Sequence, residues 1–500
     1  MFVATLLSNP LFYPIAIVLS VAGWFYYQRV LSPYAGVPGP FWASLTRFWY
    51  LNRINAQDMH RYTKMLHKQY GPLVRIAPNE VSVSDPAAMK QIYAVNAGYT
   101  KTDFYPTQAP NLSPHGDSFT QLDEKKHTYR RRMISHIFSM SSVMEGEKFI
   151  DNATAAYFQV IEEHAQKGEK MEMGHWLHMY AFDIIGELFF GRMFGFIKER
   201  RDIGGYMGAV DVILPHAIRL AVLYEWMRPI INVVMYPLSA NLRQAIRCFE
   251  ALGAESKRYV DERIGKPSAR PDMLSKLIKV MEEKSPDFDI TDVYTEAYTA
   301  IFAGSETTAT AMRSAIYHLC RNPQYKAKLV AEIDAAQREG KLSEMIAYGE
   351  AIKLPYLAAV IKEGMRVQPS IVLTFPRHVP AGGATICGHF FPEGCRVGVN
   401  PYVLHYQTSI FGEDAEDFNP DRWFRPDAAN MDSYMFQFGS GSRTCIGKNV
   451  AMAEIYKFLP KLFREYDVNL ADPTKEWKEE GAWFVKQTGV EVKFTRRNVE

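Results

Sequence analysis

Residues 438–447 read Phe-Gly-Ser-Gly-Ser-Arg-Thr-Cys-Ile-Gly, and a helical run from Val450 to Tyr466 follows them. A cysteine in a glycine-rich loop that leads into a helix can act as a thiolate, because backbone N–H groups there spread its charge. Gly441 and Gly447 allow a tight turn and the close approach of a flat macrocycle, and Arg443 can meet a ring carboxylate. A glycine-rich loop with an incidental cysteine is the alternative. Agreement at six positions favours Cys445 as the axial ligand of a haem iron.

Composition limits the class of protein. The chain has 500 residues, of which 47% are hydrophobic, so it can bury a large core. The formal charge of +2 gives no reason to expect nucleic acid as a partner. The remaining cysteines form no close pair, so neither a disulfide framework nor a zinc site is expected; they are Cys248, Cys320, Cys387 and Cys395.

The N-terminus predicts a single transmembrane helix. Residues 11–27 are apolar, and together with residues 2–7 they reach the roughly 20 residues that span a bilayer. No Lys or Arg precedes this run, which argues against a cleaved signal peptide, and Arg29 follows it. The positive-inside rule then places the body in the cytosol. A buried N-terminal helix or a signal peptide with a weak n-region is the alternative.

A proline-rich segment separates this anchor from the body. Residues 33–40 read Pro-Tyr-Ala-Gly-Val-Pro-Gly-Pro, which cannot continue a helix and is typical of a stiff hinge. We therefore divide the chain into a membrane anchor (1–29), a hinge (30–42) and one catalytic domain (43–500).

The spacing of apolar residues predicts a mainly α (α+β) body with small sheets. The expected helices are 143–166, 173–192, 238–263, 272–283, 291–321, 323–339 and 355–367. Residues 73–78 and 80–84 alternate as a hairpin, and later strands are expected at 396–399, 483–485 and 490–494. Residues 214–238 are apolar, but three prolines make one continuous helix improbable, so this stretch is either an interfacial membrane segment or core.

The middle of the helix at 291–321 carries an acid beside an alcohol. Residues 303–308 read Ala-Gly-Ser-Glu-Thr-Thr, and several of these are poor helix formers. Oxygen activation needs protons without a flood of water. Glu306 can exchange protons with solvent channels, and Thr307 can hydrogen-bond dioxygen. Alone, the triplet would more often be an ordinary exposed turn; beside Cys445 the functional interpretation is favoured.

Both motifs resemble those of cytochromes P450. The pattern Phe-Gly-x-Gly-x-Arg-x-Cys-x-Gly is matched at every position, and the likeness covers residues 30–497. The resemblance implies the cytochrome P450 fold, haem b held by residues that include Phe438, Arg443, Cys445 and Gly447, and O2 as co-substrate. In finer detail the chain looks like microsomal enzymes of filamentous fungi, of the pisatin demethylase and benzoate hydroxylase type.

The resemblance also assigns roles to charged residues. Glu363 and Arg366 lie on one helical face and, with Arg422, match a structural network of the family. In an early helix His127 and Arg131 stand where the family has Trp-x-x-x-Arg; His127 departs from the commoner Trp but can still donate a hydrogen bond. The implied haem propionate ligands are Arg131, Arg377 and Arg443. Of the arginines at 130–132, we expect Arg131 to face the haem and the other two to face outward.

Electrons must come from a separate protein, because the chain has no Gly-x-Gly-x-x-Gly unit and no length for a flavin domain. We expect NADPH–cytochrome P450 reductase, and cytochrome b5 as a second donor, to dock electrostatically on a positive patch. Its expected members are Lys125, Lys126, Arg130, Arg132, Lys448 and Lys457. The resemblance further implies a monomer in the endoplasmic reticulum membrane.

The expected activity is NADPH- and O2-dependent oxidation of a hydrophobic small molecule, as in fungal secondary metabolism. The same scaffold could instead catalyse oxidative coupling, desaturation or rearrangement, and a non-catalytic haem protein that binds a ligand is a rival from another class. The expected pocket is mostly apolar. Its candidate residues are Phe104, Tyr105, Phe119, Ile301, Phe302, Ile371, Val372, Leu373 and Thr488.

Overall fold

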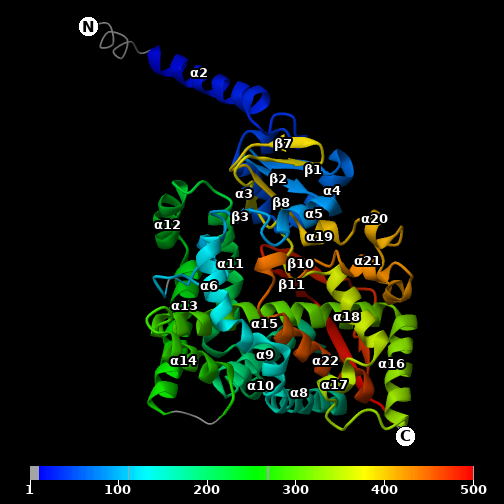
Figure 1. Ribbon diagram of the computed structural model, residues 1–500. Coiled ribbons are helices and arrows are strands. Elements are labelled where there is room, and N and C mark those ends of the chain that lie inside the picture. Colours follow the sequence, from blue (N-terminus) through cyan, green and yellow to red (C-terminus); the bar gives the residue numbers. More distant parts are fainter. Residues whose placement is uncertain (1–10, 111, 267–269, 499–500) are drawn as a thin grey trace.

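The computed structural model describes residues 11–110, 112–266 and 270–498, and it consists of a helical body with a small sheet at one end (Figure 1). Helix α15 (Ile290–Arg321) crosses the middle of the body. The predicted helix-rich α+β architecture is confirmed. Most of the long helices begin and end within a few residues of their predicted bounds, because their apolar faces are all buried against neighbouring helices.

The helices surround α15 on most sides. The longer ones are α3 (Arg47–Asn55), α4 (Met59–Tyr70), α5 (Pro86–Tyr93), α6 (Glu124–Ile134), α8 (Glu147–Lys167), α9 (Met173–Ile185), α11 (Tyr206–Ala221), α12 (Met227–Leu238), α13 (Ala240–Gly265), α14 (Met273–Lys284), α16 (Pro323–Arg338), α18 (Pro355–Val367) and α22 (Lys448–Glu465). Shorter ones are α7 (Met140–Met144), α10 (Phe196–Glu199), α17 (Tyr348–Ala351), α19 (Pro401–Leu404), α20 (Thr408–Phe411) and α21 (Ala428–Asp432).

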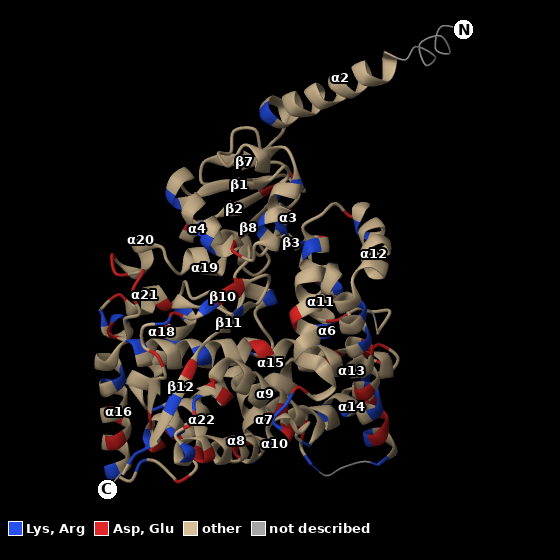
Figure 2. Cartoon of the chain, turned by 180° about the vertical axis from the view of Figure 1, so that it is seen from behind, with Lys and Arg blue, Asp and Glu red and all other residues tan. Residues whose placement is uncertain are grey.

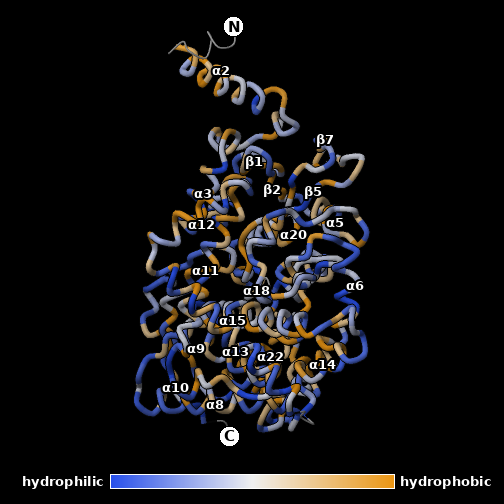
Figure 3. Tube along the Cα trace, turned by 90° about the vertical axis from the view of Figure 1, so that its left-hand side faces the viewer, coloured by the Kyte–Doolittle hydropathy of each residue, from blue (hydrophilic) through white to orange (hydrophobic). Residues whose placement is uncertain are grey.

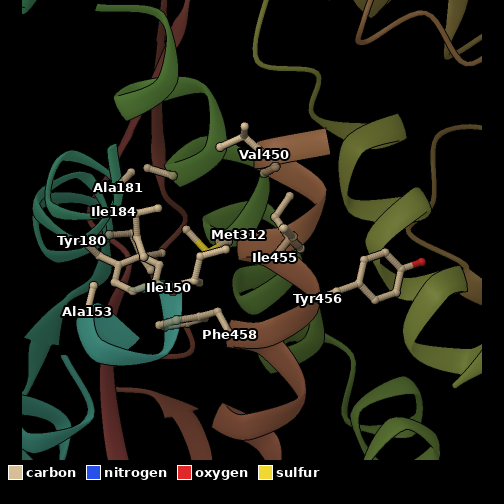
Figure 4. Close-up of a cluster of buried hydrophobic side chains, with 14 of the residues drawn as sticks. Ile150, Ala153, Tyr180, Ala181, Ile184, Met312, Val450, Ile455, Tyr456 and Phe458 are labelled. Carbon is tan, nitrogen blue, oxygen red and sulfur yellow. The ribbon is translucent and has the colours of Figure 1, made fainter. Parts of the chain in front are cut away.

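Helix α15 is fixed by a cap at its start and by packing along its second half. It begins with a capping box, in which Asp289 and Asp292 each accept a hydrogen bond from the other's backbone N–H. Its second half is buried against α9, α18 and α22. Figure 4 shows side chains of α8, α9, α15 and α22 pointing toward one another around Met312. They include Ile150, Ala153, Tyr180, Ile184, Met312, Ile455 and Phe458.

The main sheet has five strands in the order β1-β2-β8-β5-β3. The predicted hairpin forms β1 (Leu73–Ala77) and β2 (Glu80–Val83), with Leu73 opposite Val83. The next strands are β8 (Arg396–Val399), β5 (Arg377–His378) and β3 (Thr100–Lys101). In the last pair Lys101 is the Cα partner of Arg377, so the sheet places two basic residues side by side at its inner edge.

Among the described residues, three smaller sheets complete the fold. One has the order β4 (Met171–Glu172), β12 (Glu491–Arg496) and β9 (Tyr466–Leu470). The other two are hairpins, formed by β10 (Lys478–Gly481) with β11 (Val485–Thr488) and by β6 (Ala384–Ile386) with β7 (His389–Phe391). The prediction of a strand at 483–485 was wrong in its bounds, since only Val485 belongs to one. Trp483 and Phe484 make a turn ahead of β11, and both line an internal cavity.

Glu363, Arg366 and Arg422 lie together in the core. Glu363 Oε1 is 2.8 Å from Arg366 Nη2 and 3.0 Å from Arg422 Nε, and all three side chains are fully buried. Burial alone raises the pKa of the Glu363 carboxyl, but the two guanidinium groups outweigh it and lower that pKa. The arginines also donate to backbone carbonyls of residues 405–417, so this network ties α18 to the loop that precedes the cysteine.

The segment between the predicted anchor and the body packs firmly onto the sheet. Tyr34 and Val37 are buried, and the backbone N–H of Arg75 donates to the Pro38 carbonyl at 2.8 Å. Gly39 is required here, because a Cβ would lie 2.5 Å from the Arg75 carbonyl oxygen. This contact holds the hinge at a defined angle to the body.

Helix α2 (Phe12–Tyr26) projects beyond the sheet. It carries no charged residue, and in Figure 2 the blue colour of Lys and Arg appears only at its end nearest the body. In the hydropathy colouring of Figure 3, α2 is mostly orange and white. Within residues 11–498, gaps apart, no helix reaches the length and hydropathy that a transmembrane span requires. The first ten residues of the predicted anchor lie outside the described residues.

Residues 214–238 form parts of two helices rather than one. Helix α11 ends at Ala221 and α12 starts at Met227, so the expected interruption occurs, although at residues 222–226 rather than at a proline. Helix α11 is largely buried, whereas α12 has no buried residue. The expectation of core is therefore met in the first half of this stretch, while an interfacial membrane segment stays a prediction for the exposed second half.

Candidate active site

The cysteine loop has the shape that its glycines predict. Gly439 and Gly441 adopt positive φ values of 68° and 66°, which favour glycine. A Cβ at Gly441 would lie 2.1 Å from the Tyr93 carbonyl oxygen, so this position admits no side chain. The backbone N–H of Cys445 donates to the Phe438 carbonyl at 2.8 Å and closes the loop.

The Cys445 thiol is surrounded by protein yet open to an internal cavity. Burial raises the pKa of this thiol, while backbone N–H groups of Gly447 and Lys448 and the charge of Arg131 lower it. These N–H groups belong to the start of α22, where the helix dipole also favours a negative charge. The loop therefore supplies the donors that a thiolate ligand needs.

The same cavity is lined by the middle of α15. Ala303, Gly304, Thr307 and Thr308 face it, and so does Cys445. Gly304 lets α9 pack closely behind this stretch, because a Cβ there would lie 2.6 Å from Ile185 Cδ1. Thr307 Oγ1 donates to the Ala303 carbonyl at 2.9 Å, and α15 continues through this region without a break.

Basic residues gather at one edge of the cavity. Arg131, Arg377 and Arg443 all line it, as the sequence predicted, and His127 lies with them. Arg443 Nη2 contacts Glu124 Oε1 at 2.8 Å, and Arg377 Nη1 donates to the Tyr105 hydroxyl at 2.7 Å. Both ring nitrogens of His127 and Nη1 of Arg443 are buried and have no hydrogen-bond partner among the described residues.

Lys101 is a further member of this cluster that sequence reasoning missed. It is 5% exposed, and its ammonium group lies over the rings of Tyr105 and Phe119. Burial, reinforced by Arg377 and Arg443, lowers the pKa of Lys101 well below its usual value. No local pattern marks this residue, because only the pairing of β3 with β5 brings it to the cavity.

This arrangement fits an iron porphyrin. Burial and the surrounding cations lower the pKa of His127 to about 3, so its imidazole is neutral. The basic side chains outnumber the nearby carboxylates Asp117 and Glu124, and buried charge of one sign needs counterions. Two ring propionates would supply them and would accept from Arg443 Nη1 and from the single N–H of the neutral His127 imidazole.

Glu306 does not face the cavity. Its side chain is buried on another face of α15, where Oε2 is 3.0 Å from His178 Nδ1 and Oε1 is 3.3 Å from Arg313 Nη2. Burial alone raises the pKa of Glu306, but His178 and Arg313 outweigh it and bring it to about 2. The expected contact with open solvent channels is therefore replaced by an ion-paired position, and His178 was not anticipated from the sequence.

Two predicted members of the positive patch are not on the surface. Arg130 is buried, and its guanidinium contacts Asp292 at 2.8 Å, so the expectation that it faces outward was wrong. Lys457 is 2% exposed and pairs with Glu147 and Asp151. Arg130 supplies the counter-charge of the buried Asp292, and Lys457 that of two half-buried carboxylates. The members that remain exposed are Lys125, Lys126, Arg132 and Lys448.

The apolar wall of the cavity partly matches the prediction. Tyr105, Phe119, Phe302 and Ile371 line it. Phe104, Ile301, Val372, Leu373 and Thr488 do not, which corrects the expectation for these five.

These five residues do not line the cavity because their side chains pack into other parts of the protein. Phe104 packs against Trp483, with ring centroids 5.1 Å apart, and Ile301 faces the helical core. Val372 and Leu373 belong to buried clusters, and Thr488 pairs with Lys478 in the C-terminal hairpin. Sequence reasoning had the right segments but could not tell which side of each segment faces inward.

Several polar residues also line the cavity and were not predicted. They are Gln108, Asp117, Ser118, Glu296 and Thr299. Glu296 lies on the same helix as Thr307 at a spacing of 11 residues, which is about three turns, so periodicity could have placed it on the cavity face.

Comparison with known proteins agrees with this geometry. Residues 37–494 match the family model described as Cytochrome P450. The chain is 36% identical over 494 residues to cytochrome P450 monooxygenase gsfF of Penicillium aethiopicum, which covers 97% of this chain and 98% of the relative. It is 34% identical to cytochrome P450 monooxygenase cicH of Emericella nidulans, covering 95% and 96% of the two chains. It is 31% identical to a pisatin demethylase of Fusarium vanettenii, covering 95% and 92%.

Proposed function

The chain belongs to the cytochrome P450 family and is a haem-dependent monooxygenase, and from this premise we propose that it oxidises a hydrophobic small molecule of fungal secondary metabolism with electrons from a separate NADPH reductase. The observation that carries the proposal is one cavity lined both by Cys445 and by Ala303 and Thr307 of α15. Its remaining wall is rich in aromatic and aliphatic side chains, which favour an apolar substrate.

Each part of the site has a role in this reaction. When bound, the haem supplies oxygen activation and oxygen transfer to the substrate. Cys445 binds the iron, and the basic cluster around Arg377 and Arg443 holds the ring carboxylates. The aromatic wall orients the substrate and excludes water.

Proton supply is assigned to Glu306 and Thr307. Thr307 presents its hydroxyl at the cavity, and Glu306 lies one residue away on the buried side of α15. His178 Nδ1 lies 3.0 Å from Glu306 Oε2, and the low pKa of the Glu306 carboxyl means that it holds a proton only in passing, on the way from His178 to the alcohol. This separation of acid and cavity keeps bulk water away from the substrate.

The proposal is tested first by spectroscopy and then by turnover. Reduced, CO-treated holoprotein should show the red-shifted Soret band of thiolate ligation, and Cys445→Ala should lose it. With added reductase, NADPH consumption should rise in the presence of candidate metabolites, and product analysis should find oxygen inserted. Purified protein without haem, or a Soret band that survives in Cys445→Ala, contradicts the assignment.

We also propose that the reductase docks beside the cysteine loop. Lys125 and Lys126 are exposed in the first turn of α6, and Glu124 of the same turn pairs with Arg443 of the loop. Opposite charge on the partner would steer it to this surface. Charge reversal of both lysines should slow reduction by the flavoprotein at low salt and weaken its salt dependence, while Lys475→Glu should not; equal rates in all variants contradict this site.

A membrane location is proposed from two apolar elements. Helix α2 is uncharged, and α12 exposes Ile230, Val233 and Leu238 by 56%, 74% and 75%. Both elements lie toward the end of the molecule that carries β1 and β2 (Figure 1). Such a surface fits the headgroup region of a bilayer, as expected for a protein of the endoplasmic reticulum with its body in the cytosol.

Flotation with phospholipid vesicles tests this location. The full chain should float, and Val233→Glu with Ile230→Glu should reduce the bound fraction by weakening the α12 contact. Phe424→Glu, at an exposed apolar residue outside α2 and α12, is the control. A wild-type chain that stays in the soluble fraction contradicts the proposal.

A further inference from the structure

A buried acid stands at one end of the cavity, away from the cysteine. Glu296 on α15 is 4% exposed and lines the cavity, and its Oε1 has no hydrogen-bond partner among the described residues. Other cavity-lining atoms share this condition. Some belong to the basic cluster described above, and among the rest are Nε2 of Gln108 and Oγ1 of Thr299. Because buried polar groups almost always have partners, three such atoms on one cavity indicate a ligand that supplies them.

The described residues offer no partner for Oε1 of this carboxylate, although the backbone N–H of Ser118 hydrogen-bonds the carboxyl group. The positive charge of Arg130 lowers the pKa of Glu296, but the Arg130 guanidinium forms its ion pair with Asp292, at 2.8 Å. Lys101, which also lines the cavity, donates to the Phe119 carbonyl. Asp117 lies close enough to raise the pKa of Glu296 further, beyond the effect of burial, to about 7. Near neutral pH this carboxyl therefore accepts or donates a hydrogen bond with little cost.

Glu296 and the reacting end of the cavity lie on one face of α15. Residues 296, 299, 303 and 307 recur at helical spacing, and all four line the cavity. Seven residues separate Glu296 from Ala303, which corresponds to about 10 Å along the helix axis. A molecule of two fused or linked rings can span this distance. Its far end would then meet the polar group while its other end lies near Ala303.

The three atoms define what that far end must carry. The Glu296 oxygen accepts, the Gln108 amide nitrogen donates, and the Thr299 hydroxyl does either. A neutral hydroxyl both donates and accepts, so it can pair with each of the three atoms. A protonated amine only donates and would leave Gln108 without a partner.

We propose that Glu296, with Gln108 and Thr299, binds a hydroxyl group at the end of the substrate remote from the reacting carbon. This inference rests on the proposed function, since it takes the cavity to be the substrate site. It makes Glu296 a specificity-determining residue: the substrate class is a hydroxylated, otherwise apolar ring compound. Oxidation then occurs at the end of the molecule opposite the bound hydroxyl.

The test compares two rods of similar length, 4-phenylphenol and biphenyl, titrated into the holoprotein. Binding is followed by the Soret shift and by calorimetry. Wild-type protein should bind 4-phenylphenol about tenfold more tightly, the preference expected for one buried hydrogen bond to a carboxyl group. Glu296→Leu should reduce the preference to less than about twofold, because no acceptor remains.

Control variants separate this effect from general damage. Thr295→Val changes a neighbouring buried hydroxyl that donates to the Thr291 carbonyl and does not line the cavity, so the preference should persist. Glu296→Gln keeps the shape and an acceptor and should give an intermediate preference. Each variant is first checked for the thiolate-type CO spectrum.

The outcomes are distinct. Equal affinity of the two rods for the wild-type protein, or a preference that survives in Glu296→Leu, overturns the inference and leaves water as the partner of these atoms. Tighter binding of 4-phenylbenzylammonium than of 4-phenylphenol, lost in Glu296→Leu, also overturns it in favour of a cationic group. Absence of the CO spectrum in wild-type protein would instead refute the proposed function.

Discussion

Replacing Glu296 by glutamine should stabilise the protein at neutral and alkaline pH and have little effect in acid. Glutamine has nearly the same shape as glutamate but carries no charge. In wild-type protein, burial, Asp117 and Asp292 raise the pKa of Glu296, while Arg130 and the Ser118 N–H lower it, and the result is about 7. The amide removes the need to bury a charge among these groups.

The sign and size follow from the two protonation equilibria. Because the folded state holds the Glu296 proton more tightly than the unfolded chain, whose glutamates titrate near 4.5, stability is greatest below that value and is lost as pH rises through 7. The difference between the two pKa values corresponds to about 3 kcal/mol above pH 7.5. For a chain of this size, that free energy corresponds to roughly 3 °C in Tm.

The assay is thermal unfolding of holoprotein between about pH 4.5 and 8.5, with Tm of Glu296→Gln minus that of wild type plotted against pH. The difference should be small at the acidic end, rise through neutral pH and level off. Thr295→Val, which removes no titratable group, should give a constant offset. A flat difference for Glu296→Gln, or one that grows toward acid, would show that Glu296 is not a buried acid with a raised pKa.

Three other perturbations probe the rest of the molecule. Thr307→Ala should retain substrate binding but release peroxide in place of product. His178→Phe should produce a weaker form of the same uncoupling, measured as product formed per NADPH consumed. Unchanged coupling in both variants would refute the proton path. Glu363→Ala leaves two buried arginines without their carboxylate and should lower the free energy of unfolding by about 3–5 kcal/mol, measured by thermal unfolding and holoprotein yield. Lys362→Ala, which breaks an exposed pair with Asp432, should change the stability little. Gly441→Ala places a Cβ 2.1 Å from the Tyr93 carbonyl oxygen and should abolish the thiolate-type CO spectrum, while Gly349→Ala, with no atom within 4 Å, should leave it intact.

Functional motifs whose residues are close neighbours along the chain could be predicted from the sequence. The loop around Cys445, the pair Glu306–Thr307 and the Glu363–Arg366 spacing each depend on neighbours along one helix or turn, where backbone geometry sets the distances. Helix bounds were predictable for the same reason, because amphipathic periodicity reports which face of a segment is buried.

Long-range pairing was decided only by the tertiary structure. Lys101 reaches the basic edge of the cavity because β3 pairs with β5, and His178 meets Glu306 because Gly304 lets α9 approach α15. Arg130 and Lys457 looked like surface charges, yet each neutralises carboxylates brought in from other helices. A sequence shows that a residue is charged but not which distant group balances it.

The sequence by itself therefore predicted Cys445 as the haem ligand, the helix that lines the same cavity and the class of reaction. The tertiary structure decided which side chains share the cavity, including the unpartnered end at Glu296, and it turned Glu306 away from solvent. The physical reason is that covalent spacing and hydrogen bonds within one helix act over a few residues. A cavity instead is what remains after segments hundreds of residues apart have packed.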